Sequence, residues 1–168
     1  MRKFAAIVVV CAVMGSFSYA QDSSPTPGPS ANSQALLKEF TRAIKADGYV
    51  LSFVLLNDKT VDVLFQAPGK YAMRARANQA TTFYVQGMPD KDIAIETKFA
   101  AEQDGQTIPG NCLNIKNFDG TKVAKGTRVD GILQLDQKLN LTHPFKIVGT
   151  HGSVEFKLTE EALKLMQN

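Results

Sequence analysis

Residues 129–141 read VDGILQLDQKLNL, and this stretch decides the fold class. Its odd positions, starting at Val129 and ending at Leu141, are mostly apolar, while its even positions are mostly polar. A repeat of two is the side-chain period of a β-strand with one buried face, whereas a helix would spread these leucines around its whole surface. Because strands usually have about 5–6 residues, we expect either a turn near Asp136-Gln137 or a long strand that bends between two sheets.

The next stretch predicts a β-hairpin in which residues 145–150 face residues 153–158 across a two-residue turn at His151-Gly152. One face of this hairpin is apolar, with the cross-strand pairs Phe145 and Leu158, Ile147 and Phe156, and Gly149 and Val154. The other face places Lys146 opposite Lys157 and Val148 opposite Glu155. Like charges that face each other repel, so we expect this second face to be exposed to water.

The chain begins with the pattern of a secretory signal peptide over residues 1–20. Arg2 and Lys3 precede an apolar core, and Ser18-Tyr19-Ala20 fits the small residues of a cleavage site before Gln21. The apolar core is shorter than the roughly 20 residues that a membrane span needs, so we expect no transmembrane segment after cleavage. The sequence therefore predicts an exported protein, either periplasmic or secreted.

Cleavage changes the charge and the cysteine count. The whole chain has 19 Lys and Arg against 16 Asp and Glu, and loss of Arg2 and Lys3 leaves 17 against 16, a formal charge of +1. A nearly neutral chain without tryptophan argues against nucleic-acid binding. Cys112 becomes the single cysteine, and we expect either a buried thiol or an intermolecular bridge or reactive thiol. Export without an internal disulfide suits a bacterial periplasm.

A Pro- and Ser-rich segment, residues 21–32, predicts a flexible linker, and residues 33–168 form a single domain. Residues 33–47 predict a helix, capped by Ser33 and ended by Gly48, and residues 159–166 predict a short C-terminal helix. The remaining predicted strands cover residues 49–56, 60–65, 70–77, 81–86, 93–99, 112–116 and 121–124. Short strands with frequent turn signals indicate an all-β or mainly β fold, with a sandwich or barrel as the architecture.

The sequence Leu139-Asn-Leu-Thr-His-Pro-Phe145 resembles the corner before the penultimate strand of immunoglobulin-like sandwiches, where a leucine pair, a proline and an aromatic residue recur. The resemblance implies an immunoglobulin-like antiparallel β-sandwich, here with an N-terminal and a short C-terminal helix. Phe145 stands where a tyrosine is expected, so the hydroxyl hydrogen bond of a tyrosine corner cannot form.

Motifs of known catalytic and cofactor chemistry are absent from the sequence. There is no G-x-S-x-G elbow, no glycine-rich phosphate loop, and no H-E-x-x-H or C-x-x-C metal pattern. The two histidines, His143 and His151, fit a corner and a turn better than a metal site. We assign no catalytic, cofactor-binding or metal-binding residue, expect no cofactor, and leave an enzyme with an unrecognised site as the third hypothesis.

The leading hypothesis is an exported, non-catalytic β-sandwich domain that binds or scaffolds a partner in the cell envelope. A sandwich can bind through its loops or an edge strand, and the candidate loops are residues 86–92 and 103–112.

The alternative is a periplasmic carrier of an apolar or lipid-like ligand. The order of one helix followed by a strand meander, and the stretch Ala67-Pro-Gly-Lys-Tyr-Ala-Met-Arg74, resemble lipoprotein and lipid carriers that fold a curved antiparallel sheet over a helix. The resemblance implies an apolar pocket, whose candidate residues are Phe40, Phe53, Phe65, Tyr71, Met73 and Phe83. The same residues could instead fill a core.

Overall fold

The computed structural model describes residues 31–66, 69–77 and 81–167, so the predicted signal peptide and nearly all of the predicted linker lie outside the described residues. Its elements in chain order are α1 (Ala31–Phe40), β1 (Thr41–Ala46), β2 (Tyr49–Leu55), α2 (Asp58–Leu64), α3 (Gly69–Ala77), β3 (Thr82–Pro89), β4 (Ile93–Ala94), β5 (Phe99–Gln103), β6 (Gln106–Lys116), β7 (Lys122–Val123), β8 (Val129–Leu135), β9 (Phe145–Gly149), β10 (Gly152–Phe156) and α4 (Glu160–Gln167). The predicted mainly β class is confirmed.

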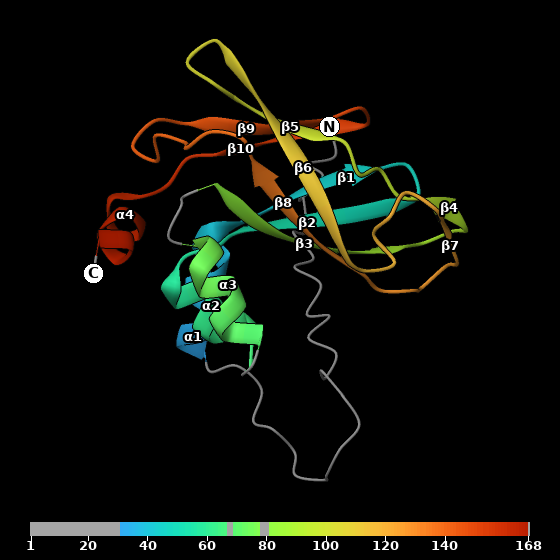
Figure 1. Ribbon diagram of the computed structural model, residues 1–168, viewed down its shortest axis with the longest axis horizontal. Helices are drawn as coiled ribbons and strands as arrows, with labels where there is room; N and C mark the ends of the chain where they lie inside the picture. Colours follow the sequence, from blue (N-terminus) through green and yellow to red (C-terminus); the bar gives the residue numbers. More distant parts are fainter. Residues whose placement is uncertain (1–30, 67–68, 78–80, 168) are drawn as a thin grey trace, which may run out of the picture.

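Eight strands form one antiparallel sheet in the order β1-β2-β3-β8-β6-β5-β9-β10, and β4 pairs with β7 in a separate small sheet. The large sheet curls into a nearly closed barrel, so that its two edge strands come together (Figure 1). At this seam the Arg42 guanidinium of β1 lies 5.7 Å from the ring centroid of Phe156 on β10. An immunoglobulin-like sandwich is not confirmed, because the eight strands follow one hydrogen-bonded order rather than two separate packed sheets.

Phenylalanine rings fill the inside of the barrel. Phe83 lies edge-on to Phe145 and Phe156, at centroid distances of 6.0 and 5.4 Å, and these two rings stack on each other at 5.0 Å. Phe53 meets Phe99 edge-on at 5.1 Å. Strand alternation places these side chains on the inner face, and such aromatic pairs are the packing that a dense core prefers.

Two glycines in the strands allow neighbouring groups of the core to pack directly against the strand backbone. A Cβ atom on Gly131 of β8 would come within 2.0 Å of the Phe118 ring, which lies against the strand. A Cβ atom on Gly110 of β6 would come within 2.9 Å of the Phe99 carbonyl oxygen. At this point β6 leaves β5, with which it pairs through residues 106–109, and continues alongside β8 through residues 110–116.

The helices α1, α2 and α3 group together at one end of the sheet (Figure 1). Phe65, at the end of α2, packs edge-on against Tyr84 on the outer face of β3, at a centroid distance of 5.1 Å. Asp62 of α2 forms ion pairs with Lys70 and Arg74 of α3. A second, smaller apolar layer thus lies outside the barrel.

The C-terminal hairpin forms, but the predicted register is wrong by two residues. Phe145 pairs with Phe156, Ile147 with Val154 and Gly149 with Gly152, so the turn is at Thr150-His151. A shift of two keeps every side chain on its predicted face, since the side-chain period of a strand is two. The shift also places Lys146 opposite Glu155, which replaces the predicted repulsion with an attraction.

Four other predicted elements are wrong. The predicted strand over residues 93–99 is broken, since only Ile93–Ala94 and Phe99 lie in strands. The predicted helix over residues 33–47 starts at Ala31 and ends at Phe40, because Thr41–Ala46 pairs with β2 as strand β1. The predicted strand over residues 60–65 is helix α2, in which Asn57 and Thr60 cap each other reciprocally through bonds of 2.9 Å. The predicted strand over residues 70–77 is helix α3.

The remaining predictions agree better with the structure. Strand β2 is paired on both sides, with β1 and β3, and is mostly buried, in partial agreement with the central strand predicted over residues 49–56. Strand β8 ends at Leu135, directly before the expected turn at Asp136-Gln137. The C-terminal helix begins beside Thr159, whose hydroxyl accepts a hydrogen bond from the Ala162 backbone N–H at 3.1 Å.

Candidate functional site

The six residues predicted to line an apolar pocket do not come together around one cavity. Phe40, Phe53 and Phe83 are fully buried in the packed core, and Phe65 packs outside the barrel on Tyr84. On α3, Tyr71 is 71% exposed and Met73 is half-buried. Rings at 5.0–6.0 Å separations occupy the interior where a carried ligand would have to fit.

The two predicted binding loops are shorter than expected. Strand β3 extends to Pro89 and strand β6 covers Gln106–Lys116, so only short turns remain of residues 86–92 and 103–112. The surface that these segments offer is therefore strand surface. On β6, Leu113 is 39% and Ile115 48% exposed, so this strand surface offers apolar side chains to solvent.

Among the groups with nucleophilic or acid–base potential, His143 pairs with Asp104, whereas His151 and Cys112 both lie near Glu96, whose carboxylate accepts from the His151 backbone N–H at 3.3 Å and whose charge acts on the Cys112 thiol. His143 Nδ1 lies 3.0 Å from Asp104 Oδ2 at the surface, while the His151 ring lies edge-on to Tyr49. Burial, together with the charge of Glu96, raises the pKa of the Cys112 thiol to about 12, so at neutral pH it is a protonated thiol and a poor nucleophile. Among residues 31–66, 69–77 and 81–167, no three or more metal-binding side chains converge.

A buried polar network lies on the outer face of β3 and β8. The Tyr84 hydroxyl donates to Asp130 Oδ1 at 2.6 Å, and the Arg128 Nε donates to both oxygens of the same carboxylate at 3.0 and 2.9 Å. Burial, reinforced by the Asp130 carboxylate, raises the pKa of Tyr84. Because the Asp130 carboxylate is satisfied from two sides, the network stabilises the sheet and leaves little capacity for a ligand.

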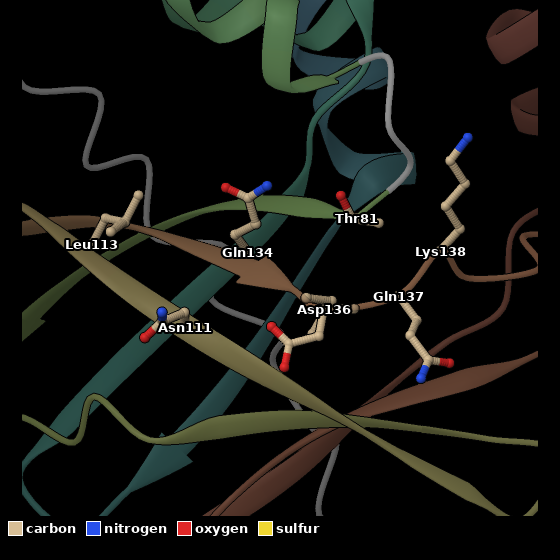
Figure 2. A pocket seen from close by; sticks show the side chains of 8 residues that line it. Thr81, Asn111, Leu113, Gln134, Asp136, Gln137 and Lys138 are labelled. Carbon is tan, nitrogen blue, oxygen red and sulfur yellow. The ribbon is translucent and has the colours of Figure 1, made fainter.

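A groove with free hydrogen-bonding capacity lies at the C-terminal end of β8. It has a volume of about 420 Å³, within the usual range for ligand sites. We call it the outer groove, and its lining residues are Thr81, Asn111, Leu113, Gln134, Leu135, Asp136, Gln137 and Lys138. Figure 2 shows that they come from strands β6 and β8, from the segment after β8 and, for Thr81, from the position directly before β3.

Most polar side chains around the outer groove are unengaged. The Thr81 hydroxyl is buried and has no hydrogen-bond partner. Of the residues that line the groove, only Gln134 makes a side-chain hydrogen bond to the described part of the chain, by accepting from Arg76 at 3.1 Å. The register explains the arrangement, because Gln134 on β8 pairs with Asn111 on β6. A buried polar group without a partner is costly, so a bound ligand could recover that free energy.

A second depression, of about 460 Å³, lies beside the β5–β6 hairpin, and two of its polar side chains, Gln103 and Asp104, are already hydrogen-bonded. The Gln103 amide donates to the Asn140 and His143 carbonyl oxygens at 2.8 and 3.3 Å, and its oxygen accepts from the Asn140 N–H at 2.8 Å. This amide ties the hairpin to the corner before β9. The outer groove is the better candidate site, because a buried hydroxyl without a partner, that of Thr81, lies in its lining.

The sequence contained part of the signal for the outer groove. Gln134, Asp136 and Lys138 occupy the polar positions of the alternating stretch, which marks them as surface residues but gives no reason to group them with Thr81.

No helix among the described residues is long and apolar enough to cross a membrane. Comparisons of the chain with protein families, curated proteins and solved structures find no match.

Proposed function

We propose that this chain is an exported, non-catalytic binding domain that holds an extended segment of a partner protein in the outer groove. The observation that carries the proposal is the group of hydrogen-bonding side chains around the groove that have no partner, with the buried Thr81 hydroxyl among them. Polar groups in folded proteins are normally satisfied, and a cluster of unsatisfied ones beside a groove favours ligand binding.

The chemistry of the lining suits a peptide. The carboxamides of Asn111 and Gln137 each donate and accept, as a peptide group does. Asp136 and Lys138 carry opposite charges, so the groove has no net preference for a charged ligand. Leu113, 39% exposed, offers an apolar contact for one side chain of the bound segment.

Other observations support a binding role over the alternatives. The packed phenylalanines inside the barrel favour binding at the surface over carriage of an apolar ligand inside the barrel. The Cys112 thiol is held in its protonated form, and the His143 ring is paired with the Asp104 carboxylate at the surface; both observations support a non-catalytic domain. The signal-peptide pattern of residues 1–20 supports export, to the periplasm or beyond the cell.

The test is a selection of heptapeptides from a random displayed library on the intact protein, followed by calorimetric titration. The double variant Gln137→Ala, Lys138→Ala removes two groove side chains. The matched control, Gln106→Ala, Lys59→Ala, removes the same chemical groups from exposed positions on β6 and α2, outside the lining of the groove.

The groove variant should bind the selected peptides at least about tenfold more weakly than the wild type, and the control should bind as the wild type does. A library that yields no binders, or binders that tolerate the groove variant, contradicts the proposal.

A further inference from the structure

The side chains around the outer groove point to two different sides. Figure 2 shows that the side chains of Thr81, Gln134 and Lys138 point towards the helices. Those of Asp136 and Gln137 point the opposite way. The charges of Asp136 and Lys138 therefore balance in number but are separated in space. We call the side that faces the helices the helix side of the groove.

Asn57 brings a second buried polar group next to Thr81. The β2–β3 pairing continues through a hydrogen bond of 2.9 Å from the Leu56 N–H to the Thr82 carbonyl oxygen, so Asn57 and Thr81 stand opposite each other. Side chains of directly opposite residues lie on one face of a sheet, with Cβ atoms about 4.5–5.5 Å apart. These two residues are only 6% and 5% exposed. Among the described residues, neither the Asn57 amide nitrogen nor the Thr81 hydroxyl has a hydrogen-bond partner.

The two amides at this place have already used an oxygen atom and offer hydrogen-bond donors. The Thr60 N–H donates to Asn57 Oδ1 at 2.9 Å, and Arg76 of α3 donates to Gln134 Oε1 at 3.1 Å. Both bonds fix which end of each amide is the oxygen, so the other end is an NH₂ group that can only donate. The Thr81 hydroxyl can donate as well. The helix side of the groove is thus rich in donors that await an acceptor.

Two positive charges accompany these donors. Lys138 is exposed in the lining of the groove, and the Arg76 guanidinium reaches it through its hydrogen bond to Gln134. In the described part of the chain neither cation forms an ion pair, whereas Lys70 and Arg74 both pair with Asp62. Hydrogen bonds between charged donors and an anion are roughly twice as strong as neutral ones. Unpaired cations beside free donors therefore favour an anionic ligand.

We propose that the helix side of the outer groove binds a carboxylate group of the partner segment. A carboxylate only accepts hydrogen bonds, and its two oxygens can serve several donors at once. One oxygen would accept from the Thr81 hydroxyl and the Asn57 amide, and the other would face the Lys138 ammonium. The inference rests on the proposed function and deepens it, because it names the chemical group that the groove recognises. The carboxylate is supplied by the C-terminus of the segment or by an acidic side chain, and the test separates these two sources.

The probes are heptapeptides selected on the intact protein from a library displayed through the peptide N-terminus, so that the C-terminal carboxylate is free. Each selected peptide is synthesised unchanged, with a C-terminal amide, and with every Asp and Glu replaced by Asn and Gln. In calorimetric titrations at neutral pH, one of the two changes should weaken binding at least about tenfold. Loss on amidation identifies the C-terminal carboxylate, and loss on replacement identifies an acidic side chain. Peptides that tolerate both changes overturn the inference and leave the proposed function standing, whereas a library without binders contradicts both.

A charge variant shows whether the carboxylate lies on the helix side of the groove. Lys138→Met should weaken binding of the unchanged peptide at least about fivefold, and that of the carboxylate-free form less than about twofold. Lys59→Met, at an exposed position of α2 outside the lining of the groove, should leave both affinities unchanged. Equal losses for the two peptide forms in Lys138→Met overturn the proposal.

Two neighbouring threonines separate ligand binding from a structural role. Thr81→Val removes a buried hydroxyl that has no partner, so it should weaken peptide binding and leave the urea midpoint of unfolding unchanged or higher. Thr82→Val is the matched control, because its hydroxyl donates to the Arg76 carbonyl oxygen at 3.2 Å, and this variant should lower the midpoint. A Thr81→Val variant that is destabilised as Thr82→Val is, or that binds the unchanged peptide as the wild type does, overturns the proposal.

Discussion

Phe83→Ala is the perturbation that tests whether the barrel interior is a packed core. The Phe83 side chain is fully buried and contacts the rings of Phe145 and Phe156 edge-on. Truncation of a buried phenylalanine to alanine usually costs about 3–5 kcal/mol, from lost transfer free energy and the cavity that remains. Since domains of this size have unfolding free energies of about 5–15 kcal/mol, the variant should be strongly destabilised and still measurable.

The assay is urea denaturation followed by circular dichroism. With a slope of about 1–3 kcal/mol per molar urea, the midpoint should fall by roughly 2 M without a change of slope. Tyr71→Ala is the control, because this side chain is 71% exposed and its loss should change the unfolding free energy by less than about 0.5 kcal/mol. Phe83→Leu should lie between the two.

A loss of less than about 1 kcal/mol for Phe83→Ala would refute the packed-core interpretation. Such tolerance would mean that the rings around Phe83 already border open space. The carrier hypothesis would then regain support, because a ligand cavity is lined by side chains whose loss costs little in the empty protein.

Three further predictions follow from the polar network, the thiol and the N-terminus. Asp130→Ala removes the acceptor of the Tyr84 hydroxyl, and urea denaturation should show a loss of about 1–3 kcal/mol; an unchanged midpoint contradicts the network's stabilising role. Because burial raises the pKa of Cys112 to about 12, its thiolate is scarce at pH 8. Alkylation of this thiol in the folded protein should be about a thousandfold slower than that of an ordinary thiol and should become faster as the pH rises. Alkylation at the rate of an unfolded control contradicts this prediction. Mass spectrometry of the chain expressed in a bacterial host should show a mature protein that begins at Gln21, and an uncleaved chain contradicts the signal peptide.

The β-strands of the C-terminal half could be predicted because their pattern is both local and unambiguous. Alternation over residues 129–135 and 145–149 is confirmed by β8 and β9. The hairpin register could not be predicted from the turn residues alone, because pairings two residues apart bury the same face. The Lys146–Glu155 pair could have favoured the correct register over the one with opposed lysines.

The errors near the N-terminus have a different cause. Phe40 and Ile44 fit a helical stripe, but residues 41–46 gain six cross-strand partners on β2 as a strand, and this tertiary pairing overrides the local pattern. For α3, the alternating interpretation missed that Lys70 and Arg74 are four residues apart and meet the same Asp62 carboxylate.

The outer groove could not be predicted, because it joins Thr81 to residues more than 50 positions away through β3–β8 pairing.

Amide hydrogen exchange along β6, measured residue by residue by NMR, tests the strand order of the sheet most directly. The Asp136 N–H donates to the Pro109 carbonyl oxygen, so by strand alternation the amides of Asn111 and Leu113 face β8 and the amide of Cys112 faces away from it. The amides of Asn111 and Leu113 should exchange at least about a hundredfold more slowly than that of Cys112. Equal protection of all three amides would contradict the account, because β6 would then be paired on both sides over residues 111–113.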